Sequence, residues 1–244
     1  TALSNAFQIK DTSNTAMEIS RAAQQEFDRF HDLLIKHNVH VIVMEDQPGT
    51  ILPDSVFPNN WISLHHDGTV VLYPMMAENR RLERRMDIHP DLQNNYGFNI
   101  IRISDYTNHE VDGQYLEGTG SVVFDYVNRI AYANRSDRTD EFVFHKLCSD
   151  LGYKGIYFEP ADPSGIDIYH TNVMMCLGTK FVVICLDAIA NESMRLKLLQ
   201  SFEETGHEVI DINFRQLNDF AGNMIEIQDR NKETVIVMSE RSHD

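Results

Sequence analysis

The sequence lacks the features of membrane, secreted and nucleic-acid-binding proteins. No stretch approaches the roughly 18 apolar residues that a membrane-spanning helix needs, and residues 1–14 show no basic segment followed by an apolar core, so no signal peptide is visible. The only cysteines are Cys148, Cys176 and Cys185, without CxxC spacing. The formal charge of −16 argues against a nucleic-acid partner. These absences predict a cytoplasmic protein with reduced thiols and no membrane segment.

Cofactor motifs are missing as well. The chain has no GxGxxG or GxxxxGK[ST] loop for a nucleotide and no HExxH or similarly spaced ligand set for a metal. His65 and His66 precede Asp67-Gly68, a hairpin turn signal, and neighbours on a strand point to opposite faces. We therefore expect neither a cofactor nor a metal.

What is present is a soluble, globular composition. The chain has 244 residues, of which 42% are apolar and 24% charged, so it is long enough to bury a sizeable core. No low-complexity stretch or Pro/Gly/Ser linker interrupts it. We therefore expect a single domain over residues 1–244.

A repeated plan is the strongest pattern in the chain. Four segments each read as a helix, an apolar strand, a loop with a polar residue, and two more apolar strands around a tight turn. The first runs through VHVIVMED, LPDSVFPNNWISLH and GTVVLYPM, and the polar markers of the four are Asn60, Glu117, His170 and Asn223. A period of roughly 50 to 60 residues is typical of a propeller or solenoid. We predict an α/β fold of ββαβ-like units arranged radially, whose loops bring the markers together.

Apolar periodicity places the helices. It predicts helices over residues 15–36, 140–151 and 191–204, with Asn191 as an N-cap and Gly206 as a stop signal. Cys148, within the second, is expected to be buried. The basic run at residues 80–85, RRLERR, has helical spacing and an internal glutamate, which favours a solvated surface helix.

Glu117 and His170 are the candidate catalytic residues. Glu117 lies in LEGTGS, whose glycines permit a tight turn. His170 precedes the strand-like TNVMMCLG, and a histidine at the mouth of a strand can act as an acid or base near neutral pH. Either residue alone could be structural, a buried histidine or a capping carboxylate. Their matching places in a radial repeat favour a functional pair.

Four motifs taken together resemble a known family. DSVFPNNW, LEGTGS, SDRT and YHTNVMM, in this order, are similar to motifs of the guanidino-group-modifying enzymes, the penteins. Among these the chain most resembles the bacterial citrulline-utilisation hydrolases, which are amidinotransferase-like. The resemblance implies a five-bladed α/β propeller and a nucleophilic cysteine near the C-terminus. Since only four repeats are visible and no cysteine follows a Gly-rich loop, we expect the last blade and the nucleophile to lie beyond this chain.

The resemblance also implies roles for individual residues. His170 matches the family's acid and base, and Glu117 the carboxylate that accepts the substrate's N–H groups. Phe57 matches an aromatic residue against the planar head group. Arg138, with Arg135 as a second candidate, matches an arginine for the substrate's α-carboxylate, although either could instead form an ordinary surface ion pair. Asp54, the first residue of DSVFPNNW, completes the expected substrate-binding set.

Two departures from the family pattern bear on the substrate. Arginine deiminases have aspartates at the positions of Asn60 and Asn172, and paired carboxylates suit a cationic guanidinium. A ureido group is neutral, and asparagine offers it both a donor and an acceptor. The alternative is that both asparagines only stabilise turns.

The sequence thus predicts a metal-independent hydrolase of carbon–nitrogen bonds in a small amino-acid substrate, with citrulline favoured. Arginine deimination and amidino transfer stay open, as does a non-catalytic propeller that serves as a binding module. A homodimer is the default expectation.

Overall fold

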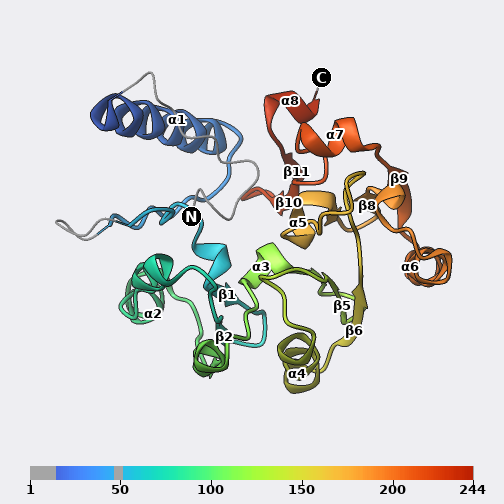
Figure 1. Ribbon diagram of the computed structural model, residues 1–244. Coiled ribbons are helices and arrows are strands. Elements are labelled where there is room, and N and C mark those ends of the chain that lie inside the picture. Colours follow the sequence, from blue (N-terminus) through green and yellow to red (C-terminus); the bar gives the residue numbers. More distant parts are fainter. Residues whose placement is uncertain (1–14, 47–51, 244) are drawn as a thin grey trace. The chain divides into compact units, whose positions relative to one another are not determined.

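The computed structural model describes residues 15–46 and 52–243 (Figure 1). The chain divides into two compact units, residues 1–50 with 226–237 and residues 51–225 with 238–244. The expected single domain stays a prediction. Residues 1–14, on which the absence of a signal peptide was judged, lie outside the described part. No helix in that part is long and apolar enough to cross a membrane.

The predicted helices form where the periodicity places them. The α-helices are α1 (Ala16–Lys36), α2 (Ile88–Tyr96), α3 (Gly118–Ser121), α4 (Glu141–Leu151), α5 (Thr171–Met174), α6 (Glu192–Glu204), α7 (Phe214–Asn218) and α8 (Glu240–His243). Four 3-10 helices are η2 (Pro58–Asn60), η3 (Glu78–Glu83), η4 (Thr107–Asp112) and η5 (Leu186–Ala188) within the described residues. The side chain of Asn191 caps α6 by accepting from the Met194 amide, as predicted. Gly206, with φ of +73°, follows the end of that helix.

The strands form small sheets of one repeated design. They are β1 (Ile62–Leu64), β2 (Thr69–Leu72), β3 (Arg102–Asp105), β4 (Val122–Asp125), β5 (Ile130–Asn134), β6 (Lys154–Phe158), β7 (Met175–Leu177), β8 (Phe181–Ile184), β9 (Glu208–Asp211), β10 (Ile225–Gln228) and β11 (Thr234–Val237). In each of three sheets an antiparallel hairpin is followed by a helix and by a strand parallel to the second hairpin strand. This is the predicted ββαβ order, and β10 pairs with β11.

The grouping of strands into repeats was partly wrong. The apolar strand placed before each polar loop belongs to the preceding sheet: β3 pairs with β2, β6 with β5 and β9 with β8. Residues 39–46, expected to be the first strand, are not in a strand. A strand needs a hydrogen-bonded partner, and β1, at the edge of its sheet, pairs with β2.

A tight turn precedes each hairpin and carries the candidate residues. In each turn an amide donates to the carbonyl three residues earlier: Asn60 to Phe57, Gly120 to Glu117, Val173 to His170 and Asn223 to Phe220. The structurally equivalent residues are therefore Phe57, Glu117, His170 and Phe220. Asn60 and Asn223 stand three residues later in the turn, so the predicted equivalence of the four markers was wrong by three positions for these two.

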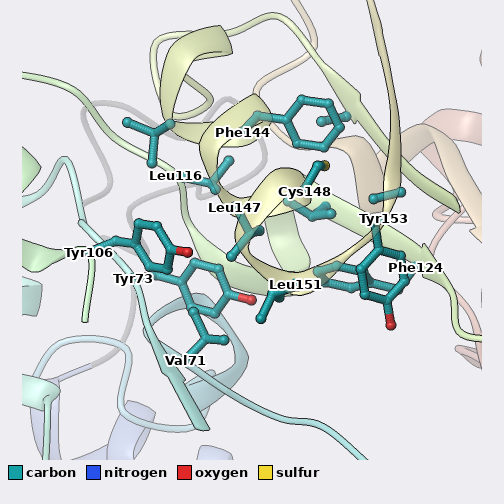
Figure 2. Packing of buried hydrophobic residues seen from close by; sticks show 14 residues of the cluster. Val71, Tyr73, Tyr106, Leu116, Phe124, Phe144, Leu147, Cys148, Leu151 and Tyr153 are labelled. Carbon is teal, nitrogen blue, oxygen red and sulfur yellow. The ribbon is translucent and has the colours of Figure 1, made fainter. Parts of the chain in front are cut away.

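The unit that includes residues 51–225 holds the main core. Cys148 of α4 packs with Phe144, Leu147 and the aromatic rings of Phe124 and Tyr153 (Figure 2), so its predicted burial is confirmed. The helix α4 packs on β6, and α6 on β9. The short helices α3 and α5 contact each other on the side away from these two (Figure 1).

The other unit contains α1. A capping box between Thr15 and Glu18 begins this helix. Past its end, the Asn38 side chain donates to Asp229 at 3.2 Å, and the Asn38 carbonyl accepts from the Arg230 amide at 3.0 Å. These bonds tie α1 to the turn between β10 and β11.

Candidate active site

Glu117 is presented by a backbone turn that requires glycine. Gly118 has φ of +49°, and a Cβ there would lie 2.0 Å from the carbonyl oxygen of Asn59. Any side chain would therefore prevent the turn from packing on η2. The sequence LEGTGS thus folds into a short helix whose N-cap residue is Glu117, with its side chain fully buried.

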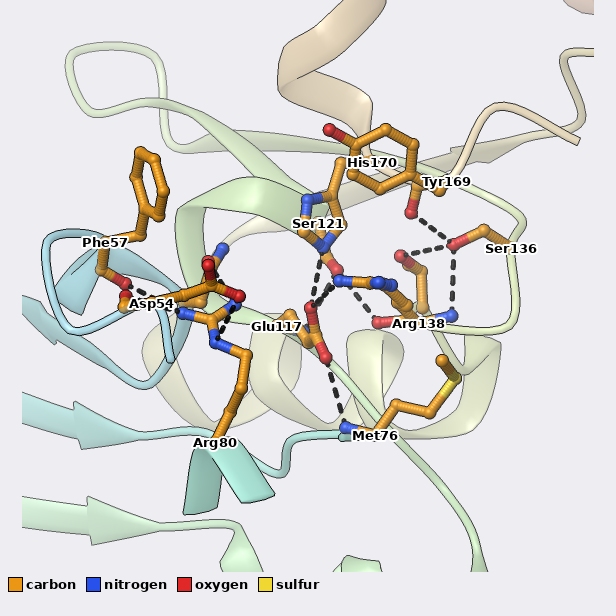
Figure 3. Close-up of polar contacts among 12 residues, drawn as sticks. Asp54, Phe57, Met76, Arg80, Glu117, Ser121, Ser136, Arg138, Tyr169 and His170 are labelled. Carbon is orange, nitrogen blue, oxygen red and sulfur yellow. Dashed lines mark hydrogen bonds and ion pairs between the residues drawn. The ribbon is translucent and has the colours of Figure 1, made fainter. Parts of the chain in front are cut away.

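Three groups hold the Glu117 carboxylate (Figure 3). Its Oε2 accepts from His170 Nε2 at 2.9 Å and from the guanidinium of Arg138 at 3.0 Å, and its Oε1 accepts from the Met76 amide at 3.1 Å. Three of about four acceptor positions of a carboxylate are thus filled. In this arrangement Glu117 orients His170. Its expected role of accepting the substrate's N–H groups stays a prediction.

The bond to Glu117 fixes which nitrogen of His170 carries the proton. A carboxylate only accepts hydrogen bonds, so the shared proton is on Nε2. Neutral imidazole then has its unprotonated nitrogen, Nδ1, on the opposite edge of the ring. A base held by a carboxylate in this way is a common arrangement for proton transfer.

Burial and charge set the ionisation of this pair. Burial is the largest effect on His170 and lowers its pKa below the usual value, although Glu117 acts in the opposite direction. Burial raises the pKa of Glu117, but the hydrogen bond and charge of His170, with the charge of Arg138, outweigh it and lower that pKa to about 2. Near neutral pH the pair is therefore a carboxylate and a neutral imidazole.

Asn60 is buried and is held by an arginine. The side-chain oxygen of Asn60 accepts from Arg80 at 2.9 Å. The same guanidinium donates from Nε to both oxygens of Glu83, at 3.2 and 3.0 Å, and its Nε lies 3.5 Å from Oδ2 of Asp54. The Asp54 amide in turn donates to Glu83 at 2.9 Å. These buried charges form a connected network behind Asn60.

Gly120 brings Asn60 and His170 together. A Cβ at Gly120 would lie 2.6 Å from Asn60 Nδ2 and 2.9 Å from both Cε1 and Nδ1 of His170. The amide nitrogen and the basic edge of the imidazole therefore lie over the same glycine. Asn60, Glu117 and His170 therefore lie together in the structure, as predicted, although they are far apart in the sequence.

The other candidate residues lie in differing surroundings. Arg138 is buried against Glu117, and Phe57 is half-exposed. Arg135 is exposed and pairs with Glu159 at 3.0 Å and with Asp167 at 3.1 Å. These are surface ion pairs, the alternative that the sequence left open for this arginine. The backbone carbonyl of Asn172, in α5, accepts from the Asn223 side chain at 2.9 Å. The substrate-binding roles of these residues stay predictions.

The basic run was misread. Residues 78–83 form the 3-10 helix η3, not a solvated α-helix, and Arg80 and Glu83 are buried. The driving interaction is a buried charged pair with additional partners, which helical spacing alone cannot reveal. One signal was available: Arg80 and Arg138 each follow the second strand of a hairpin, in the first and second repeats.

The three cysteines are buried and poorly suited to be nucleophiles. Burial raises the pKa of Cys148 to about 12 and that of Cys176 to about 11, and it also raises the pKa of Cys185. Cys176 lies in β7, and Cys185 stands one residue past β8. Within the described residues, no group of three or more His, Cys, Asp or Glu side chains is placed to hold a metal.

Comparisons with known proteins show what the fold is similar to. Among solved structures, the fold is similar to the arginine dihydrolase ArgZ of cyanobacteria, with a TM-score of 0.61 and 19% identity over 85% of this chain. For the N-terminal domain of ArgZ, as a cysteine-to-serine mutant bound to substrate, the TM-score is 0.60 and the identity 18%. That match covers 82% of this chain and 68% of the ArgZ domain. AgrE in complex with L-arginine gives 0.62 and 22% over 84% of this chain. The chain spans only 30% of full-length ArgZ and 28% of AgrE.

The fold and the family model place this chain in the pentein, or guanidino-group-modifying, superfamily. All residues, 1–244, match the family model described as N,N dimethylarginine dimethylhydrolase, eukaryotic, and the chain belongs to that family. No curated protein matches the sequence. The predicted superfamily and α/β fold are thereby confirmed. The narrower resemblance to bacterial citrulline-utilisation hydrolases stays a prediction.

Proposed function

We propose that the full-length protein hydrolyses a ureido or guanidino amino acid, with L-citrulline favoured and ornithine, ammonia and carbon dioxide as products. The observation that carries this proposal is the buried bond of 2.9 Å between His170 and Glu117, next to Asn60. It provides an oriented base at neutral pH beside an amide that can bind a planar head group.

The nucleophile is proposed to be a cysteine outside residues 1–244. Cys148 and Cys176 have raised pKa values because they are buried, and a thiol in that state is a poor nucleophile. In the proposed reaction neutral His170 takes the proton of the cysteine thiol, and the resulting thiolate attacks the head-group carbon. The imidazolium of His170 then protonates the leaving amine, and the ring, neutral again, takes a proton from the water that resolves the covalent intermediate.

The repeated sheets suggest how the site is supported. We propose that the three ββαβ sheets are blades of a five-bladed α/β propeller, with the turns of Glu117 and His170 near its axis. Amidino transfer and arginine deimination are the alternatives within the family. A non-catalytic binding module is the alternative of another class, and the ionised Glu117 with its oriented histidine argues against it.

The test is release of ornithine from citrulline by the full-length protein. His170→Ala should lower kcat by at least ~100-fold, because general acid–base catalysis contributes on the order of 10²–10⁴. His145→Ala, which removes an exposed histidine on α4, is the matched control and should retain the rate. Turnover by the wild type that survives in His170→Ala would refute the assignment. Absence of turnover with any ureido or guanidino amino acid would favour the binding module.

A further inference from the structure

Thr171, the residue after His170, has its hydroxyl group enclosed by hydrogen-bonding groups of other segments. Thr171 is fully buried. Its hydroxyl oxygen accepts from the backbone amide of Asn134 at 2.9 Å. A hydroxyl has one proton to donate, and two acceptors lie within its reach, the carbonyl oxygen of Ser121 at 2.6 Å and Oδ1 of Asn134 at 2.5 Å. The hydroxyl therefore joins the start of α5 to two segments of the preceding repeat.

One of these segments is the turn that presents Glu117. Ser121 is the last residue of α3 and is fully buried. Its own hydroxyl accepts from the Glu117 amide at 3.0 Å and donates to the carbonyl oxygen of Arg138 at 2.9 Å. A connected series of hydrogen bonds thus leads from the backbone of Glu117 through Ser121 and Thr171 to the backbone beside His170.

The other segment is the end of β5, where Asn134 is also fully buried. The side-chain NH₂ group of Asn134 donates to the carbonyl oxygens of Ile168 at 2.5 Å and Arg135 at 3.1 Å. These bonds leave Oδ1 of Asn134 to face Thr171. Because Thr171 and its partners are buried, loss of the hydroxyl would leave polar groups that water cannot readily satisfy.

The hydrogen bond between His170 and Glu117 depends on how these segments are held together. Glu117 is the N-cap residue of α3 and His170 that of α5, and the two short helices contact each other. The side chains meet at 2.9 Å across this contact. A hydrogen bond of that length tolerates little relative movement of the two turns.

We propose that Thr171 is a positioning residue, whose hydroxyl holds the turn of His170 against the turn of Glu117 and so sets the geometry of the bond between them. Thr171 acts through His170 and not on the substrate. This inference rests on the proposed function and adds a residue to the candidate site that its motif did not single out.

The test is Thr171→Val in the full-length protein, which replaces the hydroxyl by a methyl group of similar size. With citrulline, kcat should fall by at least ~10-fold while KM changes by less than about 3-fold, since displacements near 1 Å can cost about 100-fold and the hydroxyl faces only protein groups. Nuclear magnetic resonance titration should give a His170 pKa below the wild-type value, because Glu117 raises that pKa and would be held less well.

Two further variants separate positioning from a loss of stability. Thr171→Ser keeps the hydroxyl and should recover most of the wild-type kcat and the wild-type His170 pKa. Thr69→Val is the matched control, since Thr69 is buried at the start of β2 and its hydroxyl accepts from Arg102 at 2.8 Å. It should lower the unfolding midpoint and leave kcat and the His170 pKa unchanged.

If Thr171→Val does not fold, Ser121→Ala tests the same series of bonds. It removes the hydroxyl that accepts from the Glu117 amide, and it should lower both kcat and the His170 pKa.

Three results would overturn the inference and leave the proposed function standing. They are a Thr171→Val protein with the wild-type kcat, a fall in its kcat without a change in the His170 pKa, and a Thr171→Ser protein as slow as Thr171→Val. If the wild type hydrolyses no ureido or guanidino amino acid, the proposed function is rejected. The titration needs no turnover and still decides whether Thr171 controls the bond between His170 and Glu117.

Discussion

Two buried arginines take different places in the hydrogen-bond networks of this site. Arg138 pairs with Glu117 at 3.0 Å, and that carboxylate holds His170. Arg80 pairs with Glu83 at 2.9 Å, and there the arginine itself holds Asn60. In the first network the carboxylate of Glu117 contacts the candidate site residue, and in the second the guanidinium of Arg80 does.

The difference teaches how similar ion pairs can prepare different groups. The anion of the first network fixes the tautomer of a base. The cation of the second fixes the orientation of an amide. Both effects require burial, because exposed ion pairs are screened and mobile.

Breaking either network should have the largest effect on stability. Arg138→Met or Arg80→Met leaves a buried carboxylate without its arginine, and each should lower the free energy of unfolding by about 3–5 kcal/mol. Urea denaturation followed by circular dichroism measures this. A loss below about 1 kcal/mol in either variant would mean that its network is not held by charge.

A methyl group at Gly120 should disturb the meeting point of the two networks. Gly120→Ala pushes on Asn60 Nδ2 and the His170 ring, and we expect kcat/KM to fall by at least ~10-fold, since displacements near 1 Å can cost about 100-fold. Gly155→Ala is the control: its Cβ would meet Cys148 and Phe144 at 3.0 Å, so it should reduce stability and leave the site intact. Equal activity losses in the two variants would contradict the account.

The titration of His170 measures how strongly the Glu117 carboxylate acts on the imidazole. Glu117 raises the pKa of His170 against the effect of burial, so Glu117→Gln should lower the His170 pKa still further. Nuclear magnetic resonance titration of the His170 ring protons measures this. A pKa that rises, or does not move, would show that Glu117 does not act on the imidazole.

The same shifts have a consequence for stability. Because the folded-state pKa of His170 lies below its unfolded value, the unfolded chain binds this proton first. Stability should therefore fall as the pH drops below about 6.5, the unperturbed histidine value. Glu117 contributes stability above its unfolded pKa that is lost as the pH falls toward about 2. Thermal unfolding from pH 7 to acid measures both, and constant stability across this window would contradict the assigned shifts.

The smallest effect is expected at Arg135. Its pairs with Glu159 and Asp167 are exposed, so Arg135→Met should barely move the unfolding midpoint. Comparison with Arg138→Met in the same denaturation experiment sharpens the contrast between exposed and buried pairs. A similar destabilisation in both variants would mean that burial does not determine how much these ion pairs contribute to stability.

Sequence reasoning located one network and missed the other. Glu117 and His170 stand out because glycines follow the carboxylate in LEGTGS and because the histidine precedes a strand-like run. Asn60 was found through its motif, but it was wrongly matched to Glu117 and His170 in the repeat. The short turn before each hairpin gives no signal in the sequence, so the position of Asn60 within that turn could not be predicted. Arg80 was hidden because an Arg–Glu pair three residues apart is typical of an exposed helix. Only tertiary packing buries it.

The most direct test of the central claim is the ratio of kcat/KM for citrulline and arginine in the full-length wild-type enzyme. If Asn60 and the oriented His170 form a site for a neutral head group, citrulline should be preferred by about 100-fold, because one unpaired contact and one uncompensated desolvation each cost on the order of 1–3 kcal/mol. Equal values, or a preference for arginine, would contradict the account.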